Sequence, residues 1–238
     1  MKSPILQVFY EDEHILVCYK PAKIATESSK IGTPDMVSIL KNYINQSSAR
    51  TGNPYLAVIH RLDQPVSGIL VFAKTPSAAK ELNRQLTTHK FGKYYLALVS
   101  RAPENQEAVL EHYLVKDAKS NTSRICTPDT PGAKFARLSY KMLRDKTDFF
   151  APDQYSFDSG TSPAVLEIHL DTGRHHQIRV QLAGIGCPIV GDTKYNPASS
   201  HMHTWQNICL CAYKLSFYHP VTRRQMHFEI SASDVKAI

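Results

Sequence analysis

The apolar residues of this 238-residue chain change several times between the two-residue period of strands and the 3.6-residue period of helices. Runs such as Ile15 to Tyr19 and Val165 to Leu170 predict buried strands. Two threonine–proline pairs, Thr33-Pro34 and Thr75-Pro76, predict helix starts, and a third, shorter helix is expected from about His175 to Ile185. The buried stripes of the first two helices are predicted to be Val37, Leu40 and Ile44, then Ala79, Leu82 and Leu86. The class is therefore mixed, with strands dominant.

The organisation of the chain favours one catalytic domain over residues 1–238, because no internal repeat and no Gly- or Ser-rich linker divides it. Gly92 is expected to stop the second helix before a strand from Tyr94 to Val99. The polar stretches Lys116 to Ala133 and Asp145 to Pro163 predict loops. Between these loops, Phe135 to Leu143 predicts another strand.

The charge balance favours a polyanionic partner. The chain has 28 Lys and Arg against 21 Asp and Glu, a formal net charge of +7, and each phosphate that is neutralised releases counterions. The longest apolar runs are far shorter than the roughly 20 residues of a membrane-spanning helix. The start lacks the pattern of a secretory signal, and five cysteines without a CxxC pair indicate reduced thiols, so a cytoplasmic protein is expected.

The segment from His60 to Gly68 places an acid, Asp63, beside two potential cations and just before a buried strand, Ile69 to Ala73. An Asp in such a turn often only caps the turn through its own side chain. Spacing alone does not separate that structural role from a catalytic one.

Four motifs in order resemble those of the RluA-type pseudouridine synthases. They are His60-Arg61-Leu62-Asp63, Lys93-Tyr94-Tyr95-Leu96-Ala97-Leu98-Val99, Thr172-Gly173-Arg174-His175-His176-Gln177-Ile178-Arg179-Val180 and Pro188-Ile189-Val190-Gly191-Asp192. Each motif alone is weak, but chance matches to four must multiply. The resemblance covers the chain from about Ile15 to the final strand.

The resemblance implies an α+β fold, in which a mixed, mainly antiparallel sheet has flanking helices and an active-site cleft across it. It also implies that the protein isomerises a uridine in RNA to pseudouridine, with Asp63 as the catalytic carboxylate. The reaction breaks the N1–C1′ bond and rejoins the uracil through C5 without net redox change, so no cofactor is expected. A carboxylate can attack C1′ on an acylal route or remove the 2′ proton on a glycal route, and the sequence does not choose between them.

Two further catalytic roles follow from the resemblance. Arg179 is expected to pair with Asp63 and hold it ionised, because a nearby cation lowers the pKa of a carboxylate. Tyr95 is expected to stack on the uracil and is a candidate for removing the C5 proton. Tyr94 should point to the opposite face of the same strand, because side chains alternate.

The predicted partner is a structured RNA, either transfer RNA or ribosomal RNA, whose target uridine must be flipped out or already splayed. The candidates for RNA binding are Arg61, Arg174, Lys74 and Lys90. The resemblance begins close to the start of the chain, so a separate N-terminal RNA-binding domain is not expected. A monomer that contacts no membrane and binds no nucleotide cofactor is the default expectation.

This chain departs from the family pattern at four positions. The family commonly has Thr at the position of Val66, Gly near Lys23 in a K-P-x-G segment, and His at the positions of Gln181 and Cys187. The departures leave the carboxylate in place and affect the expected RNA contacts.

Three alternatives stay open at this point. A glycoside hydrolase would need a second carboxylate opposite Asp63, and Asp171 and Asp192 are the available acids. A non-catalytic RNA-binding or folding factor would keep the scaffold without the reaction. A metal site would use the two pairs His201-x-His203 and Cys209-x-Cys211, whose spacing does not match common zinc patterns, so no metal is expected.

Overall fold

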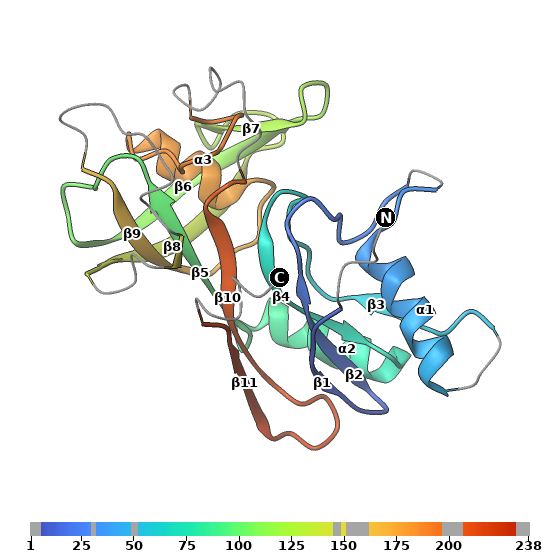
Figure 1. Cartoon of the computed structure of the whole chain (residues 1–238). Coiled ribbons are helices and arrows are strands. Elements are labelled where there is room, and N and C mark those ends of the chain that lie inside the picture. The colour runs from blue at the N-terminus through green and yellow to red at the C-terminus, as the bar shows by residue number, and fades with distance from the viewer. Residues whose placement is uncertain are drawn as a thin grey trace. The chain divides into compact units, whose positions relative to one another are not determined.

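The computed structural model of the chain describes residues 6–29, 32–48, 52–144, 149–150, 162–196 and 207–231. The elements in chain order are β1 (Val8–Glu11), β2 (Ile15–Lys20), α1 (Met36–Ser48), β3 (Ala57–Val58), β4 (Ser67–Ala73), α2 (Pro76–Thr87), β5 (Gly92–Val99), β6 (Glu107–Asp117), β7 (Thr122–Cys126), β8 (Lys134–Leu143), β9 (Ala164–Leu170), α3 (Gln177–Gly184), β10 (Leu210–Tyr218) and β11 (Gln225–Glu229). Strands outnumber helices, and the predicted α+β class is confirmed (Figure 1). Among the residues that the structure describes, no helix is long and apolar enough to cross a bilayer.

Two compact units make up the chain. The first consists of Met1–Gly92, Ala212–Ile230 and Lys236–Ile238, and the second of Lys93–Cys211 and Ser231–Val235. The first unit therefore draws strands from both ends of the sequence.

The strands of the first unit run in the order β1-β2-β4-β10, with β3 beside β4 and β11 beside β10 (Figure 1). β2 and β4 pair antiparallel, from Ile15 opposite Ala73 to Lys20 opposite Gly68. All six residues of β2 are buried, as expected for a strand covered on both faces. Their burial explains the continuous apolar run in the sequence.

The two helices of the first unit differ in how well their starts were predicted. α2 begins at Pro76, and the Thr75 side chain accepts a hydrogen bond from the N–H of Ala78, which confirms the expected cap. It ends at Thr87, before the predicted stop at Gly92. The expected cap of α1 at Thr33 is wrong, because the Asp35 carboxylate accepts from the N–H of Ser38 at 2.7 Å and α1 begins at Met36.

The strands of the second unit run in the order β5-β9-β8-β6-β7. β5 pairs antiparallel with β9, β9 with β8, and β8 with β6. A small apolar cluster of Leu114, Ala136 and Val180 joins β6 and β8 to α3, with Tyr195 packed against it. α3 thus covers one face of this sheet.

The prediction of a loop from Lys116 to Ala133 is wrong. Its first half contains the end of β6 and all of β7, which pair antiparallel from Tyr113 opposite Cys126 to Asp117 opposite Thr122. The Asp117 carboxylate closes the connecting turn by accepting from the N–H of Lys119 and the hydroxyl of Ser120, both at 2.8 Å. An exposed hairpin has little apolar alternation, so its sequence resembles a loop. The second predicted loop, Asp145 to Pro163, lies almost entirely outside the described residues.

Candidate functional site

Asp63 lies half-buried at the start of a turn that leads into β4. The N–H of Val66 donates to the Asp63 carbonyl oxygen at 3.0 Å, which closes this turn. Gly68 follows at φ 134°, and a Cβ there would collide with Ala212 of β10. The turn therefore ends in a glycine because neighbouring backbone leaves no space for a side chain.

The residues around Asp63 are tied to the segment after β2. The hydroxyl of Thr26 donates to the Leu62 carbonyl at 3.1 Å and accepts from the Leu62 N–H at 3.2 Å. The backbone N–H of Lys23 donates to the Gln64 carbonyl at 2.9 Å. Both neighbours of Asp63 are thus held by hydrogen bonds.

Lys20 is a buried lysine that the sequence reasoning missed. Its side chain has no exposed surface, and its ammonium donates to the carbonyls of Pro21 at 2.9 Å, Ile24 at 2.6 Å and Gln64 at 3.1 Å. The Gln64 contact fixes the turn that carries Asp63 to the end of β2. The signal for this role was the Lys20-Pro21 pair of the K-P-x-G segment. Within that segment Lys23 has φ 73°, the left-handed conformation that favours the family's glycine.

The basic candidates of the first unit differ in their surroundings. Arg61 is largely exposed and pairs with Glu27 at 3.1 Å. The Lys74 ammonium donates to Glu11 at 2.6 Å and to the Asp12 carbonyl at 2.7 Å, with only 18% of the side chain exposed. Lys90 is exposed. Arg61 and Lys90 are accessible to a phosphate, whereas Lys74 is already engaged with Glu11.

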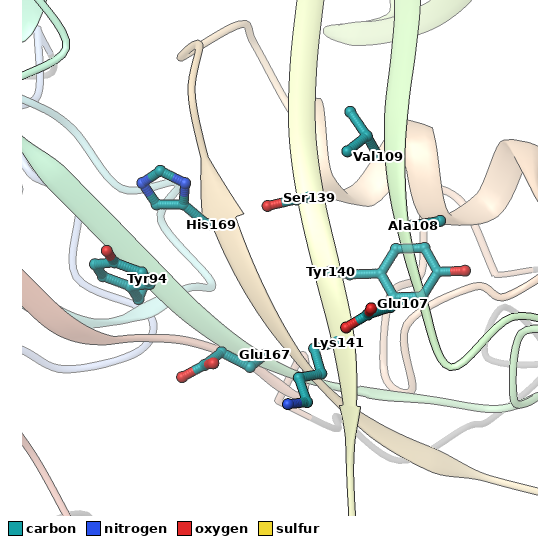
Figure 2. A pocket seen from close by; sticks show the side chains of 9 residues that line it. All are labelled: Tyr94, Glu107, Ala108, Val109, Ser139, Tyr140, Lys141, Glu167 and His169. Carbon is teal, nitrogen blue, oxygen red and sulfur yellow. The ribbon is translucent and has the colours of Figure 1, made fainter.

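Tyr95 and Tyr94 lie on opposite faces of β5 in the second unit, as strand geometry requires. Tyr95 is buried and lies opposite Ile168 of β9. The ring of Tyr94 stacks on His169 with centroids 4.7 Å apart. Figure 2 shows both of these side chains at a pocket of about 430 Å³, and Tyr95 is not among the residues that line it.

Arg179 lies on α3 and forms a buried ion pair with Asp192. Its Nε donates to Oδ2 and its Nη2 to Oδ1, both at 2.8 Å. Only 5% of the Arg179 side chain and none of the Asp192 side chain is exposed. Arg179 belongs to the second unit and Asp63 to the first, and the expected pairing of these two residues stays a prediction.

Arg174 precedes α3 and is exposed, with its Nε donating to the Phe135 carbonyl at 2.8 Å. The helix is preceded by His176, whose φ of 54° places it in the left-handed region. The Nδ1 of His176 shares a hydrogen bond with the Tyr195 hydroxyl at 2.8 Å. Arg174 is thus anchored through Nε on the surface, in an exposed position that suits contact with a phosphate.

The two acids that a glycosidase would need both have cationic partners. Asp192 pairs with Arg179, and Asp171 pairs with Arg137 at 3.2 Å and lies 3.4 Å from His169. All the paired groups belong to the second unit. Each acid is therefore engaged in an ion pair within the second unit.

Within the described ranges, no group of three or more His, Cys, Asp or Glu side chains is arranged to hold a metal ion. The histidines of the proposed pair, His201 and His203, lie outside these ranges. Cys209 and Cys211 are both buried and take part in no disulfide among the described residues.

Three of the four departures from the family pattern, Val66, Gln181 and Cys187, are buried. Burial raises the pKa of the Cys187 thiol. The amide of Gln181 donates to the Leu110 carbonyl at 3.1 Å inside the second unit. A side chain with an amide group thus fills the place where the family has an imidazole.

Comparison with known proteins gives a consistent result. The sequence model of the family described as RNA pseudouridylate synthase matches residues 14–184. An uncharacterised RNA pseudouridine synthase of Bacillus subtilis is 30% identical over 91% of this chain and 65% of its own length. A second relative, from Chloroflexus aurantiacus and of the same description, is 34% identical over 72% of this chain and 48% of its own length. The chain thus spans about two thirds and about half of these two relatives.

A tRNA pseudouridine synthase C of Vibrio parahaemolyticus is 29% identical over 96% of this chain and 91% of its own length. Among solved structures, the human protein named RNA pseudouridylate synthase domain containing 4 superposes with a TM-score of 0.73 at 20% identity, over 94% of this chain and 88% of that one. This structural likeness shows a shared fold.

Proposed function

Because the chain belongs to the RNA pseudouridylate synthase family, of the RluA type, we propose that it converts a specific uridine of a structured RNA to pseudouridine, with Asp63 as the catalytic carboxylate. The observation that carries the proposal is the turn of the His60-Arg61-Leu62-Asp63 motif, which three groups, Lys20, Lys23 and Thr26, hold by its backbone. Such support is what a reacting group needs, since a misplacement of 1 Å costs about 10²-fold in rate.

The chemistry needs one acid at the ribose and no redox partner. The N1–C1′ bond breaks, the uracil turns, a C5–C1′ bond forms, the C5 proton leaves and N1 takes up a proton. A carboxylate stabilises the positive charge that develops at C1′, and it is also able to attack C1′ or to remove the 2′ proton. The proposed enzyme therefore works without metal or nucleotide cofactor.

We also propose that Arg179 and Tyr95 take part in the reaction with Asp63, and that residues 1–238 form one catalytic domain. The guanidinium of Arg179 keeps the Asp63 carboxylate ionised. The Tyr95 ring stacks on the uracil, and its hydroxyl removes the C5 proton. The support for both roles is the match of each residue to its family motif.

The RNA is bound through phosphate contacts of exposed cations, and the target base is extruded from its stack. Arg61, Arg174 and Lys90 are the proposed contacts with the best accessibility, and Lys74 is a weaker one because Glu11 occupies its ammonium. The named relatives include a tRNA pseudouridine synthase C and a ribosomal large subunit pseudouridine synthase D. We propose a tRNA or rRNA substrate on this basis. We also propose a monomer that acts in the cytoplasm, where the five cysteines would stay reduced.

The test is to incubate the purified protein with total RNA from a host strain that lacks the gene, and to map new pseudouridines by carbodiimide adduct sequencing. New sites that depend on the wild-type protein would establish the activity and identify the substrate. Tight RNA binding by a folded protein without any new site would favour the alternative, a non-catalytic RNA-binding factor on the same scaffold. Release of free uracil would instead indicate a glycoside hydrolase.

A further inference from the structure

The two faces of the sheet in the second unit differ in charge. One of them, the α3 face, is the face on which Leu114 and Ala136 pack against α3. Because side chains alternate along a strand, the registers of β5, β6, β7, β8 and β9 assign each strand residue to one face. Among these strand residues, the α3 face carries three lysines, Lys93, Lys116 and Lys134, and no acid. The strands themselves therefore leave the positive charge of this face without a counter-charge.

The opposite face of the same sheet has a mixed charge. Its strand residues include four acids and three cations, which are Glu107, Glu111, Asp117 and Glu167 with Arg124, Arg137 and Lys141. Arg137 pairs with Glu111 at 3.0 Å and with Asp171 at 3.2 Å. Most residues that line the pocket in Figure 2 belong to this face, including Glu107 and Glu167. A polyanion is therefore attracted more strongly to the α3 face than to the opposite one.

Two of these lysines are neighbours on the α3 face, where β8 begins. Lys134 lies opposite Leu114 of β6, and Lys116 follows Leu114 by two positions on the same strand and face. The two lysines are thus diagonal neighbours, about 7–8 Å apart. Both are exposed, and neither forms an ion pair with a described acid. Like charges at this separation repel one another, so an anion that contacts both stabilises the arrangement.

Arg174 brings a third cation to the same place. Its Nε donates at 2.8 Å to the carbonyl of Phe135, the residue that follows Lys134. The guanidinium is exposed and forms no ion pair with a described acid. Arginine and lysine are the side chains that most often contact phosphate oxygens. The three cations therefore have the chemistry of a site for a phosphate backbone.

The hairpin of β6 and β7, which carries Lys116, is fixed to the segment that carries Arg174. Ser123 lies opposite Lys116, and its hydroxyl shares a hydrogen bond of 2.9 Å with Nδ1 of His175. The N–H of Ser123 donates to the Tyr195 hydroxyl at 2.7 Å. The Lys194 ammonium donates to two carbonyls of the hairpin turn, at 2.8 and 3.4 Å. The backbone that presents the cations is thus ordered before binding, which lowers the entropy cost of binding.

We propose that Lys116, Lys134 and Arg174 form a phosphate-binding surface on the α3 face, which holds the RNA backbone next to the target uridine. The inference rests on the proposed function, because it takes RNA as the polyanion. Tyr95 belongs to the same face of the sheet, through its place opposite Ile168, and is the proposed stacking partner of the uracil. Phosphate contacts carry no base sequence, so this surface supplies affinity and position.

The test compares two double variants that each remove two positive charges from the second unit. Lys116→Gln with Lys134→Gln changes the α3 face. Arg124→Gln with Lys141→Gln changes the opposite face and is the matched control, since all four side chains are exposed and none has an ion pair with a described acid. The probe is end-labelled total RNA from a strain that lacks the gene, and its affinity is measured by filter binding at about 50–200 mM KCl, a range over which phosphate contacts change affinity steeply.

Each phosphate contact adds about 0.7–0.9 to the slope of log affinity against log salt, or about five- to eightfold in affinity at 0.1 M relative to 1 M salt. The α3-face variant should therefore lose about 1.4–1.8 of the slope and bind about 25- to 60-fold more weakly at 0.1 M salt. The control should stay within about threefold of the wild-type affinity, because the acids of its face already offset its charge. Lys116→Arg with Lys134→Arg keeps both charges and should also stay within about threefold.

Two results would overturn the inference: an α3-face variant with the wild-type slope and affinity, or a control variant that loses as much as the α3-face variant. The comparison measures binding and not turnover, so it is separate from the test of the proposed function. Wild-type protein that shows the expected binding pattern but forms no pseudouridine would refute the proposed function and leave the phosphate-binding surface in place.

Discussion

Replacing Lys20 with Met removes the ammonium that joins the Asp63 turn to the end of β2 while keeping most of the side-chain volume. The ammonium donates three hydrogen bonds of 2.6 to 3.1 Å to backbone carbonyls. Hydrogen bonds to a charged group contribute about 1.5–3 kcal/mol each, or about 4.5–9 kcal/mol for three. Relief from burying the charge offsets several kcal/mol of this loss. We expect a net decrease of about 2–4 kcal/mol in the free energy of unfolding.

The assay is urea unfolding at pH 7, together with the rate of tritium release from RNA labelled at C5 of uridine, since pseudouridine formation expels the C5 proton. Lys23→Met is the matched control, because Lys23 is an exposed lysine three residues away, and it should change stability by less than about 0.5 kcal/mol. The rate of Lys20→Met should fall by at least about tenfold under conditions where the variant is folded, because the Asp63 turn loses its contact with β2. A stability within about 0.5 kcal/mol of wild type, together with a wild-type rate, would refute this reasoning.

Three further predictions concern other parts of the molecule. The pKa of Glu81 is lowered to about 2, chiefly by its hydrogen bond with Arg84, so the stability it contributes is present above pH 4.5 and lost as the pH falls through 2. Glu81→Gln should cost about 0.5–1 kcal/mol at pH 7, after allowance for solvent screening, and clearly less at pH 2 by urea unfolding. An equal cost at both pH values would contradict this cause. Lys23→Gly should raise the free energy of unfolding by about 0.5–1 kcal/mol, since φ is 73° there, and a lower stability in the same assay would show that the left-handed backbone is not strained. Tyr95→Phe should bind RNA within about threefold of wild type by filter binding but slow tritium release, and an unchanged release rate would exclude the hydroxyl as the C5 base.

The parts of the fold that could be predicted are those with strong local signals. Thr75 and Pro76 mark the start of α2 by interactions within one turn, and the apolar runs of β2 and β4 reflect burial on both faces. The hairpin of β6 and β7 was missed because apolar residues such as Val109 and Tyr113 also lie on the exposed face of β6, which hides its alternation in the sequence. Most of β7 is exposed or only partly buried. The cap of α1 was misplaced by two residues, because Thr33 and Asp35 are both good caps and only the backbone path selects one.

The site shows the same limit. The proposed site residues Asp63, Tyr95 and Arg179 come from their motifs, and the alternation of side chains along β5 separates Tyr94 from Tyr95. The supporting contacts were not predicted. Lys20 contacts a carbonyl 44 positions away. Asp192 was named as part of the fourth motif and as a possible second acid, but its pairing with Arg179, 13 positions away, was not predicted. Such contacts depend on how distant segments meet, which local patterns do not encode.

The most direct test of the account is to compare wild-type protein and Asp63→Asn on total RNA from a strain that lacks the gene, with new pseudouridines mapped by carbodiimide adduct sequencing. The account predicts new sites with the wild type and none with Asp63→Asn, while the variant binds RNA within about threefold of wild type. New sites formed equally by both proteins would contradict the assignment of Asp63 as the catalytic carboxylate.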